Sequence, residues 1–199
     1  MRQPTFSADA CTSDAEEDRA LVSRYRQGDR EAFTLLVVRY QRPVYNAAFW
    51  VLRKGEDASD ISQTVFLKAA ERIADYDPRY KFFSWLYRIA INESLNLLRK
   101  RGHEDELEDD SELPARDSEG PEWQLNAAER AQRLQAALMK LSTKDRVVIS
   151  LRHFSDCSYQ EIAHILDVDD KTVKSRLFEA RQRLRVLLGD LEGPSHDRH

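Results

Sequence analysis

The chain has 199 residues, of which 33% are charged and 41% hydrophobic, and its formal net charge is −4. No apolar run approaches the roughly 18 residues that a membrane span requires, and the N-terminal residues lack the apolar core of a signal peptide. These properties predict a cytoplasmic, helix-rich protein of one domain or two small domains, with no membrane insertion.

Charge is distributed unevenly along the chain. Residues 1–102 carry a net charge of +3, residues 103–122 carry −9, and residues 123–199 carry +2. Two mildly basic, patterned halves are therefore separated by an acidic strip. This arrangement is typical of a two-domain nucleic-acid-binding protein with a charged connector.

Residue types that carry catalysis or bind metals are scattered. Cys11 and Cys157 lie far apart without a CxxC spacing, and the five histidines form no cluster in the sequence. Neither a Gly-rich phosphate loop nor a pair of carboxylates with catalytic spacing is found. We therefore expect no enzyme, no disulfide or metal framework and no cofactor.

The first helices are indicated by apolar residues at helical spacing. Residues 1–17 are polar and unpatterned, so we expect a disordered tail there. From Asp18 onward the helical pattern begins; it breaks at Gly28, and Pro43 marks the expected start of a new helix.

A further helix is predicted over residues 56–73, with Asp57 or Ser59 as its N-cap. Pro78 then interrupts the helical pattern, because proline lacks an N–H donor and biases the preceding residue away from helix. The result is a loop rich in aromatic and basic residues.

The helix predicted over residues 82–101 combines an apolar side with a polar, basic surface. Trp85 taken alone is an ordinary core aromatic. Aromatic rings beside asparagine and basic side chains are nevertheless suited to holding unstacked bases, because rings stack, Asn reads base edges and Arg or Lys contacts phosphates. The polar and basic side chains of this segment are Arg88, Asn92, Asn96, Arg99, Lys100 and Arg101.

The C-terminal part predicts a helix-turn-helix. Ser158 and Glu161 form a capping box for a short helix, and Asp169 or Asp170 is a suitable N-cap for a second one. From residue 171 to 188 the second helix holds six basic residues against one acid, Glu179, as a recognition helix requires. The alternative is a solvated basic face on a helical hairpin. Upstream, we expect Ser142 to cap a supporting helix.

Three segments, in this order, resemble the extracytoplasmic-function (ECF, group 4) sigma factors of the sigma-70 family of bacterial RNA polymerase: DASDISQTVFLKAAERI, FSWLYRIAINESLNLLRKR and LSTKDRVVISLRHFSDCSYQEIAHILDVDDKTVKSRLFEARQRL. The resemblance implies an all-α fold of two small helical domains. A σ2 domain would span 18–101 and a σ4 domain with the helix-turn-helix 123–190. A flexible acidic linker would span 102–122, and a C-terminal tail 191–199.

Such a protein would direct core RNA polymerase to −35/−10 promoters and assist promoter melting. Its partners would be the β′ clamp helices and the β flap of the core enzyme, and promoter DNA. By position, the core-binding residues are Asp57, Asp60, Gln63, Phe66 and Leu67. Those expected at the −10 element are Tyr76, Arg79, Tyr80, Lys81, Arg88, Asn92 and Asn96. Those expected at the −35 element are Thr172, Lys174, Ser175, Arg176, Phe178, Glu179 and Arg183, with Arg181 on phosphates.

The chain departs from the family pattern in the core-binding helix, where DAEDLVQETF is usual. Ser59 and Thr64 each stand where glutamate is common, and Ser62 replaces an apolar residue. Phosphorylation of Ser59, Ser62 or Thr64 by a Ser/Thr kinase would restore negative charge on this surface. Neutral variation at an exposed helix is the alternative.

A second departure is in the recognition helix, where Glu179 stands at a position that often holds arginine. A glutamate can accept a hydrogen bond from cytosine N4. It can equally form a salt bridge with Arg183 one turn later, and both interpretations stay open.

Control by an anti-sigma factor, by phosphorylation or by abundance also stays open. The alternative function is a stand-alone helix-turn-helix regulator in which residues 18–101 form a signal or dimerisation domain. A helical adaptor without DNA specificity is disfavoured by the basic last helix.

Overall fold

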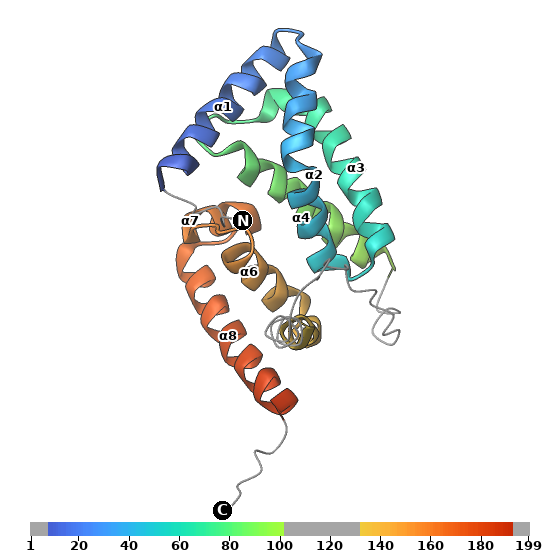
Figure 1. Ribbon diagram of the computed structural model, residues 1–199, viewed down its shortest axis with the longest axis vertical. Helices are drawn as coiled ribbons and strands as arrows, with labels where there is room; N and C mark the ends of the chain where they lie inside the picture. Colours follow the sequence, from blue (N-terminus) through green and yellow to red (C-terminus); the bar gives the residue numbers. More distant parts are fainter. Residues whose placement is uncertain (1–7, 102–131, 193–199) are drawn as a thin grey trace, which may run out of the picture.

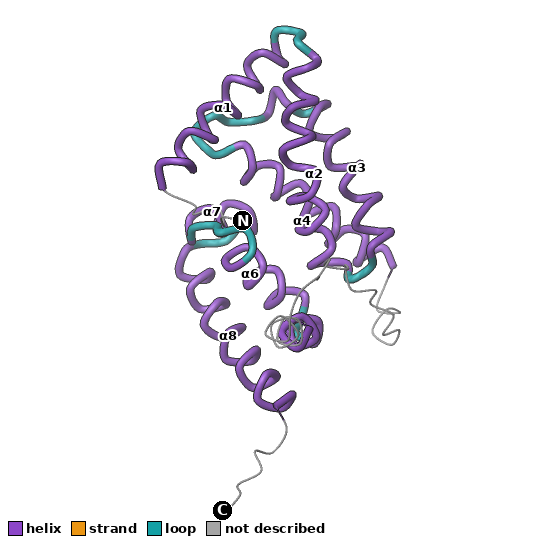
Figure 2. Tube along the Cα trace, in the orientation of Figure 1, coloured by secondary structure: helices purple, strands orange, loops and turns teal. Residues whose placement is uncertain are grey.

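The computed structural model describes residues 8–101 and 132–192, and within them the side chains of residues 15–101 and 132–189. The described ranges are helices joined by short loops, without a β-strand (Figure 2). The predicted all-α class is therefore confirmed. In chain order the elements are α1 (Ala8–Arg26), α2 (Arg30–Leu52), α3 (Gly55–Glu71), a short 3-10 turn η1 (Ile73–Asp75), α4 (Phe82–Arg101), a helix over residues 132–140, α6 (Thr143–His153), α7 (Tyr159–Leu166) and α8 (Asp170–Glu192).

The helices form two groups, as the sequence pattern predicted (Figure 1). In the first group, α2 packs against α1, α3 and α4. In the second group, α6 packs against α7 and α8. The largest fully buried side chains include Leu36, Val44, Phe82, Leu86 and Ile91 in the first group and Leu138, Leu151, Ile162, Ile165 and Leu177 in the second.

The N-terminal helix begins earlier than expected. Residues 1–17 were predicted to be a disordered tail, but α1 starts at Ala8. The segment ADACTSDAEED is rich in alanine and acidic residues, which favour a helix and suit its positive N-terminal end. It lacks an apolar stripe, so periodicity alone did not reveal it.

Two predicted helix boundaries in the first group differ from the structure. α2 runs without interruption from Arg30 to Leu52 with Pro43 inside it, so no new helix starts there. Proline removes one hydrogen bond, and buried residues on both sides, Leu36 and Val44, hold the helix together. α3 begins at Gly55 rather than beside Asp57 or Ser59, and Asp57 binds Arg101 instead.

The predicted caps of the second group are confirmed. Ser142 accepts a hydrogen bond from the Asp145 backbone at 3.3 Å. Ser158 and Glu161 form both bonds of the capping box, and Asp169 accepts from the Thr172 backbone at 2.6 Å at the start of α8. These N-caps could be predicted from local sequence because each cap joins residues only a few positions apart.

The two groups pack directly against each other, with α2 against α6 and α4 against α7 (Figure 1). At the first contact, Arg146 of α6 is 2% exposed and donates to the carbonyls of Trp50 and Val51 at the end of α2. The Trp50 ring also stacks on Phe154, with centroids 5.0 Å apart. The predicted linker, residues 102–122, lies outside the described residues.

Candidate nucleic-acid interface

The loop between η1 and α4 is held rigidly from behind. Arg26 of α1 donates to the carbonyls of Ile73 at 2.6 Å and Tyr76 at 2.9 Å. The Tyr76 hydroxyl donates to the Tyr80 carbonyl at 2.8 Å, and its ring packs edge-on against Phe82. Tyr76 is only 3% exposed, so it supports the loop from the core rather than facing DNA as the sequence suggested.

The tip of the loop is a small turn closed by its own charges. Asp77 accepts hydrogen bonds from the backbone N–H of Arg79 at 2.9 Å and from its guanidinium. These bonds hold the pKa of Asp77 below its ordinary value. The Arg79 side chain remains 84% exposed, so a cationic group stands at the surface in a defined position.

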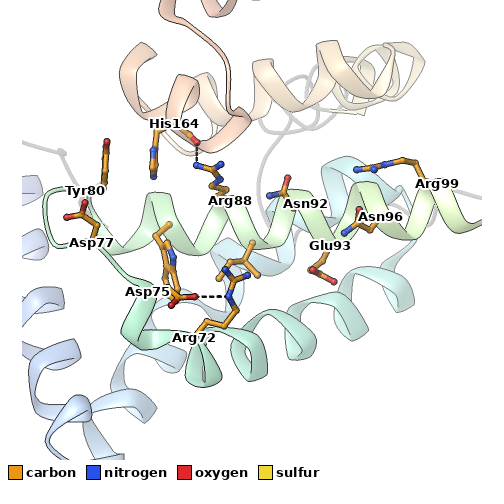
Figure 3. Close-up of a pocket in the computed structure, with 12 residues that line it drawn as sticks. Arg72, Asp75, Asp77, Tyr80, Arg88, Asn92, Glu93, Asn96, Arg99 and His164 are labelled. Atoms are coloured by element: carbon orange, nitrogen blue, oxygen red, sulfur yellow. Dashed lines mark hydrogen bonds and ion pairs between the residues drawn. The ribbon is translucent and has the colours of Figure 1, made fainter.

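A cleft of about 660 Å³ follows the polar side of α4. Arg88, Asn92 and Asn96, which the sequence placed on one helix face, do line one cleft, and both asparagines are exposed. Trp85 and Ile89 supply apolar walls. Figure 3 shows Asn92, Asn96 and Arg99 following one another along α4. The complete lining is Arg72, Asp75, Asp77, Tyr80, Trp85, Arg88, Ile89, Asn92, Glu93, Asn96, Arg99 and His164.

One end of this cleft is bounded by α7 of the second group. The Tyr80 and His164 rings stack with centroids 3.9 Å apart and planes only 6° apart (Figure 3). Lys81 pairs with Glu161 at 2.8 Å, and Arg88 pairs with Asp167 at 3.1 Å. Three residues expected to contact the −10 element therefore contact a neighbouring helix.

These contacts alter the titration of the α7 side chains. Burial lowers the pKa of His164, and nearby Arg88 lowers it further. Burial alone would raise the pKa of Glu161, but hydrogen bonds from Lys81 and Ser158 hold it below its ordinary value. The sequence did not single out Glu161, His164 and Asp167 as partners of the loop. Their i, i+3, i+6 spacing marks one helix face, but does not say what that face meets.

The outer face of α8 is open. Buried Val173, Leu177 and Ala180 attach the helix to its group, which turns the opposite side outward. Phe178 is 64% exposed there. Of the residues expected at the −35 element, Lys174, Ser175 and Glu179 are also exposed, and Thr172 and Arg176 are half-buried.

Several of the expected −35 residues are engaged with other side chains, and Ser175 donates to Glu179 at 3.4 Å. Arg183 donates to both carboxylate oxygens of buried Asp145, at 2.7 and 2.8 Å, and to Glu179 at 3.2 Å. Glu179 therefore makes the i, i+4 salt bridge that was one of its two interpretations. The Glu179 carboxylate remains half-exposed, with 53% of the side chain accessible, so cytosine recognition stays a prediction. Arg181 lies beside His153.

Comparison with known proteins identifies the family to which this chain belongs. Residues 36–104 match the family model described as Sigma-70 region 2, and residues 131–184 match Sigma-70, region 4. The RNA polymerase sigma-H factor of Pseudomonas aeruginosa is 32% identical over 185 residues, which cover 88% of this chain and 96% of the relative. The chain belongs to the ECF sigma factors of the sigma-70 family.

Other relatives of this sigma factor agree. The ECF RNA polymerase sigma-E factor of Haemophilus influenzae is 35% identical over 84% of this chain and 93% of its own length. The solved structure of CnrH in complex with the cytosolic domain of CnrY aligns with a TM-score of 0.66 at 29% identity, covering 87% of this chain and 98% of that one. RpoE of Bartonella quintana, solved with the anti-sigma factor NepR, aligns with a TM-score of 0.61 at 27% identity, covering 83% and 98%.

The expected core-binding surface of this sigma factor lies on α3. Leu67 is 67% exposed, and Asp60 and Gln63 are exposed as well. Phe66 is half-buried against the core. Asp57 is held by Arg101 of α4, which limits its freedom to meet a partner.

The three candidate phosphorylation residues of the sigma factor differ in accessibility. Ser59 is exposed, and Thr64 is half-buried, with its hydroxyl donating to the Asp60 carbonyl at 2.9 Å. Ser62 is 9% exposed and lies in the core. A kinase could therefore reach Ser59 or Thr64, but not Ser62 in the folded protein.

In the described part of the chain, no helix is long and apolar enough to cross a bilayer.

Proposed function

We propose that this sigma factor directs core RNA polymerase to −35/−10 promoters, with α4 and the loop before it reading the melted −10 strand and α8 reading the −35 duplex. The observation that carries the proposal is the cleft along α4. An apolar wall, two exposed asparagines and several arginines are combined there in one groove.

The cleft has the chemistry that a single strand requires. Trp85 and Tyr80 offer ring faces for unstacked bases, and Asn92 and Asn96 offer amide groups for base edges. Exposed Arg79 supplies a cation for the phosphate backbone. Extruding a base costs a few kcal/mol, and contacts inside the cleft offset that cost.

For the −35 element, the exposed face of α8 suits a major groove. Lys174 and Arg176 reach phosphates or base edges, whereas Arg183 contributes less directly because it is bound to Asp145. α3 supplies the surface for the β′ clamp helices, centred on exposed Leu67 with Asp60 and Gln63 beside it. The β flap would meet the second group of helices.

Control of this sigma factor is proposed to act on α3 or through an anti-sigma factor. Ser59 and Thr64 are the hydroxyl groups on α3 that a kinase could reach, and a phosphate would add about −1.5 to −2 charges there. Control by an anti-sigma factor is supported by the similarity to RpoE of Bartonella quintana, whose structure was solved in complex with the anti-sigma factor NepR.

The test combines the purified chain with sigma-free core RNA polymerase and a promoter library in multi-round transcription. Wild type should bind core and initiate at a defined set of promoters. Leu67→Asp should weaken core binding by about tenfold or more, because it places a charge at the centre of an apolar contact. The matched control, Ser23→Asp, adds the same charge at an exposed position of α1 and should bind core normally.

A double variant tests the cleft separately. Asn92→Ala with Asn96→Ala should bind core like wild type but fail to form open complexes. Duplex DNA binding by a chain that does not bind core would refute the sigma function and favour the stand-alone regulator.

A further inference from the structure

A buried carboxylate in the first turn of α6 is bound to the recognition helix α8. Asp145 is 5% exposed, and its carboxylate accepts a hydrogen bond from the Ser142 hydroxyl at 2.9 Å. From α8, Arg183 Nη1 donates to both oxygens of the same carboxylate, at 2.8 and 2.7 Å. Because α6 packs against α8 (Figure 1), these bonds fix the Arg183 side chain to a second helix.

The same guanidinium group holds Glu179. Its other terminal nitrogen, Nη2, donates to Glu179 Oε2 at 3.2 Å. A guanidinium is planar and has its donors in a fixed fork, so the bonds to Asp145 also set the direction from which Glu179 is held. The second oxygen, Glu179 Oε1, accepts from the Ser175 hydroxyl at 3.4 Å. Each oxygen of the Glu179 carboxylate is therefore held by a residue one helical turn away.

The Glu179 carboxylate remains available to a ligand. Its side chain is 53% exposed, and a carboxylate can accept about four hydrogen bonds, so acceptor positions are left on its outer side. It lies among exposed side chains of the outer face of α8, including Lys174 and Phe178. A salt bridge between two exposed side chains is weak, but here Arg183 is anchored at its buried end by Asp145.

We propose that Arg183 is a positioning residue: anchored on Asp145, it holds the Glu179 carboxylate in the orientation that accepts a hydrogen bond from a cytosine N4 amino group in the −35 major groove. This inference rests on the proposed function, because it assumes that α8 reads the −35 duplex. The salt bridge and cytosine recognition, which the sequence left as alternatives, then involve the same carboxylate. Arg183 itself makes no contact with DNA.

Holding Glu179 before DNA binds improves discrimination between bases. An exposed glutamate without such bonds samples several rotamers, and ordering it on binding lowers affinity by about fivefold. A fixed carboxylate also cannot turn away from the acceptor atoms of guanine or thymine, so the wrong base is disfavoured. The preference for cytosine at one −35 position should therefore depend on Arg183, whereas the preferences at the other positions should not.

Promoter selection tests this dependence with holoenzyme, assembled from the full chain and sigma-free core, on a library with a randomised −35 element. Glu179→Ala should abolish the preference for cytosine at one position, which identifies the base that Glu179 reads. Arg183→Met should reduce the preference at that same position about fivefold and leave the other positions unchanged. Arg185→Met removes the same charge from an exposed position of α8 and should keep the preference for cytosine.

A second variant separates positioning from folding. Arg183→Met leaves the buried Asp145 carboxylate without its charged partner, which destabilises the σ4 group. The double variant Asp145→Asn/Arg183→Met removes both charges together and keeps a side-chain oxygen for the Ser142 hydroxyl. Thermal melting shows whether each variant stays folded. The folded double variant should lose the preference for cytosine as Arg183→Met does.

The salt dependence of promoter binding distinguishes a positioning residue from a phosphate contact. If Arg183 bound a phosphate, Arg183→Met would weaken binding to all −35 sequences equally. It would also lower the slope of log K against log salt concentration by about one. A positioning residue leaves that slope unchanged and alters the preference at one position only.

The results separate this positioning role from the proposed function. If wild type initiates at −35/−10 promoters, the positioning role is overturned by any of three results: an unchanged −35 preference in Glu179→Ala, an unchanged preference in the folded double variant, or a lower salt slope in Arg183→Met. The proposed function then stands. If wild type does not initiate at such promoters, the proposed function is overturned and the positioning role with it.

Discussion

Arg146 is the most informative residue to change, because it joins the two halves of the molecule from a buried position. Its guanidinium donates to the Trp50 carbonyl at 2.5 Å and the Val51 carbonyl at 3.3 Å in the first half. It donates to the Leu141 carbonyl at 2.9 Å within its own half. The proposed variant is Arg146→Met, which keeps an unbranched chain and removes every donor.

The expected change in the free energy of unfolding for Arg146→Met follows from two opposing contributions. Burial lowers the pKa of Arg146 to about 10, which corresponds to a desolvation cost of roughly 3 kcal/mol. Against this, hydrogen bonds from a charged donor contribute about 1.5–3 kcal/mol each. The two shortest bonds offset the desolvation cost, and the longer bond to Val51 adds to them. Methionine also leaves buried carbonyls unpaired, so we expect a net destabilisation of about 2 kcal/mol.

Urea unfolding followed by far-UV circular dichroism measures this change. The variant should show a lower unfolding midpoint than wild type, because the two halves are less firmly docked. Arg133→Met, an exposed change on the helix over residues 132–140, should alter the free energy of unfolding by less than about 0.5 kcal/mol. If Arg146→Met behaved like this control, the reasoning about a buried interdomain donor would be refuted.

Three further predictions concern recognition and control. Glu179→Arg should change the −35 sequence obtained by promoter selection, because glutamate accepts from cytosine whereas arginine donates to guanine; an unchanged consensus would show that Glu179 is not a base reader. Thr64→Glu should raise the affinity for core polymerase, with Thr64→Gln as the uncharged control; equal affinities would remove support for Thr64 as a switch. Burial, and then Arg88, lower the pKa of His164 against the opposing effects of Asp167 and Asp77, so protonation of His164 disfavours its packing against Tyr80. The contact is complete above the unperturbed pKa of about 6.5 and weakens as pH falls below it. The difference in urea unfolding midpoint between wild type and His164→Ala should therefore shrink towards zero on going from about pH 7.5 to about pH 5.5, and a constant difference would contradict this account.

The features that were predicted correctly depend on neighbours in sequence. Ser142, the Ser158–Glu161 capping box and Asp169 act over three residues, so a local pattern was sufficient. The shared face of Arg88, Asn92 and Asn96 follows from helical periodicity alone. Helical spacing also predicted the Glu179–Arg183 salt bridge as one of two interpretations of Glu179.

The features that were missed depend on distant parts of the chain. Tyr76 looked like a surface aromatic in a polar loop, but its ring completes the core beside Phe82. Pro43 looked like a helix start, but burial of the flanking residues carries α2 through it. No sequence pattern singled out Arg146, which is buried where α6 packs against α2.

The sequence by itself determined the helices, the division into two patterned halves, and the family, because periodicity, caps and motif order are properties of the chain. Only the tertiary structure decided that α7 covers one end of the α4 cleft. No pattern links Lys81 to Glu161 or Tyr80 to His164. Those pairs are made by docking two halves whose relative position depends on long-range contacts such as that of Arg146, which local propensity does not encode.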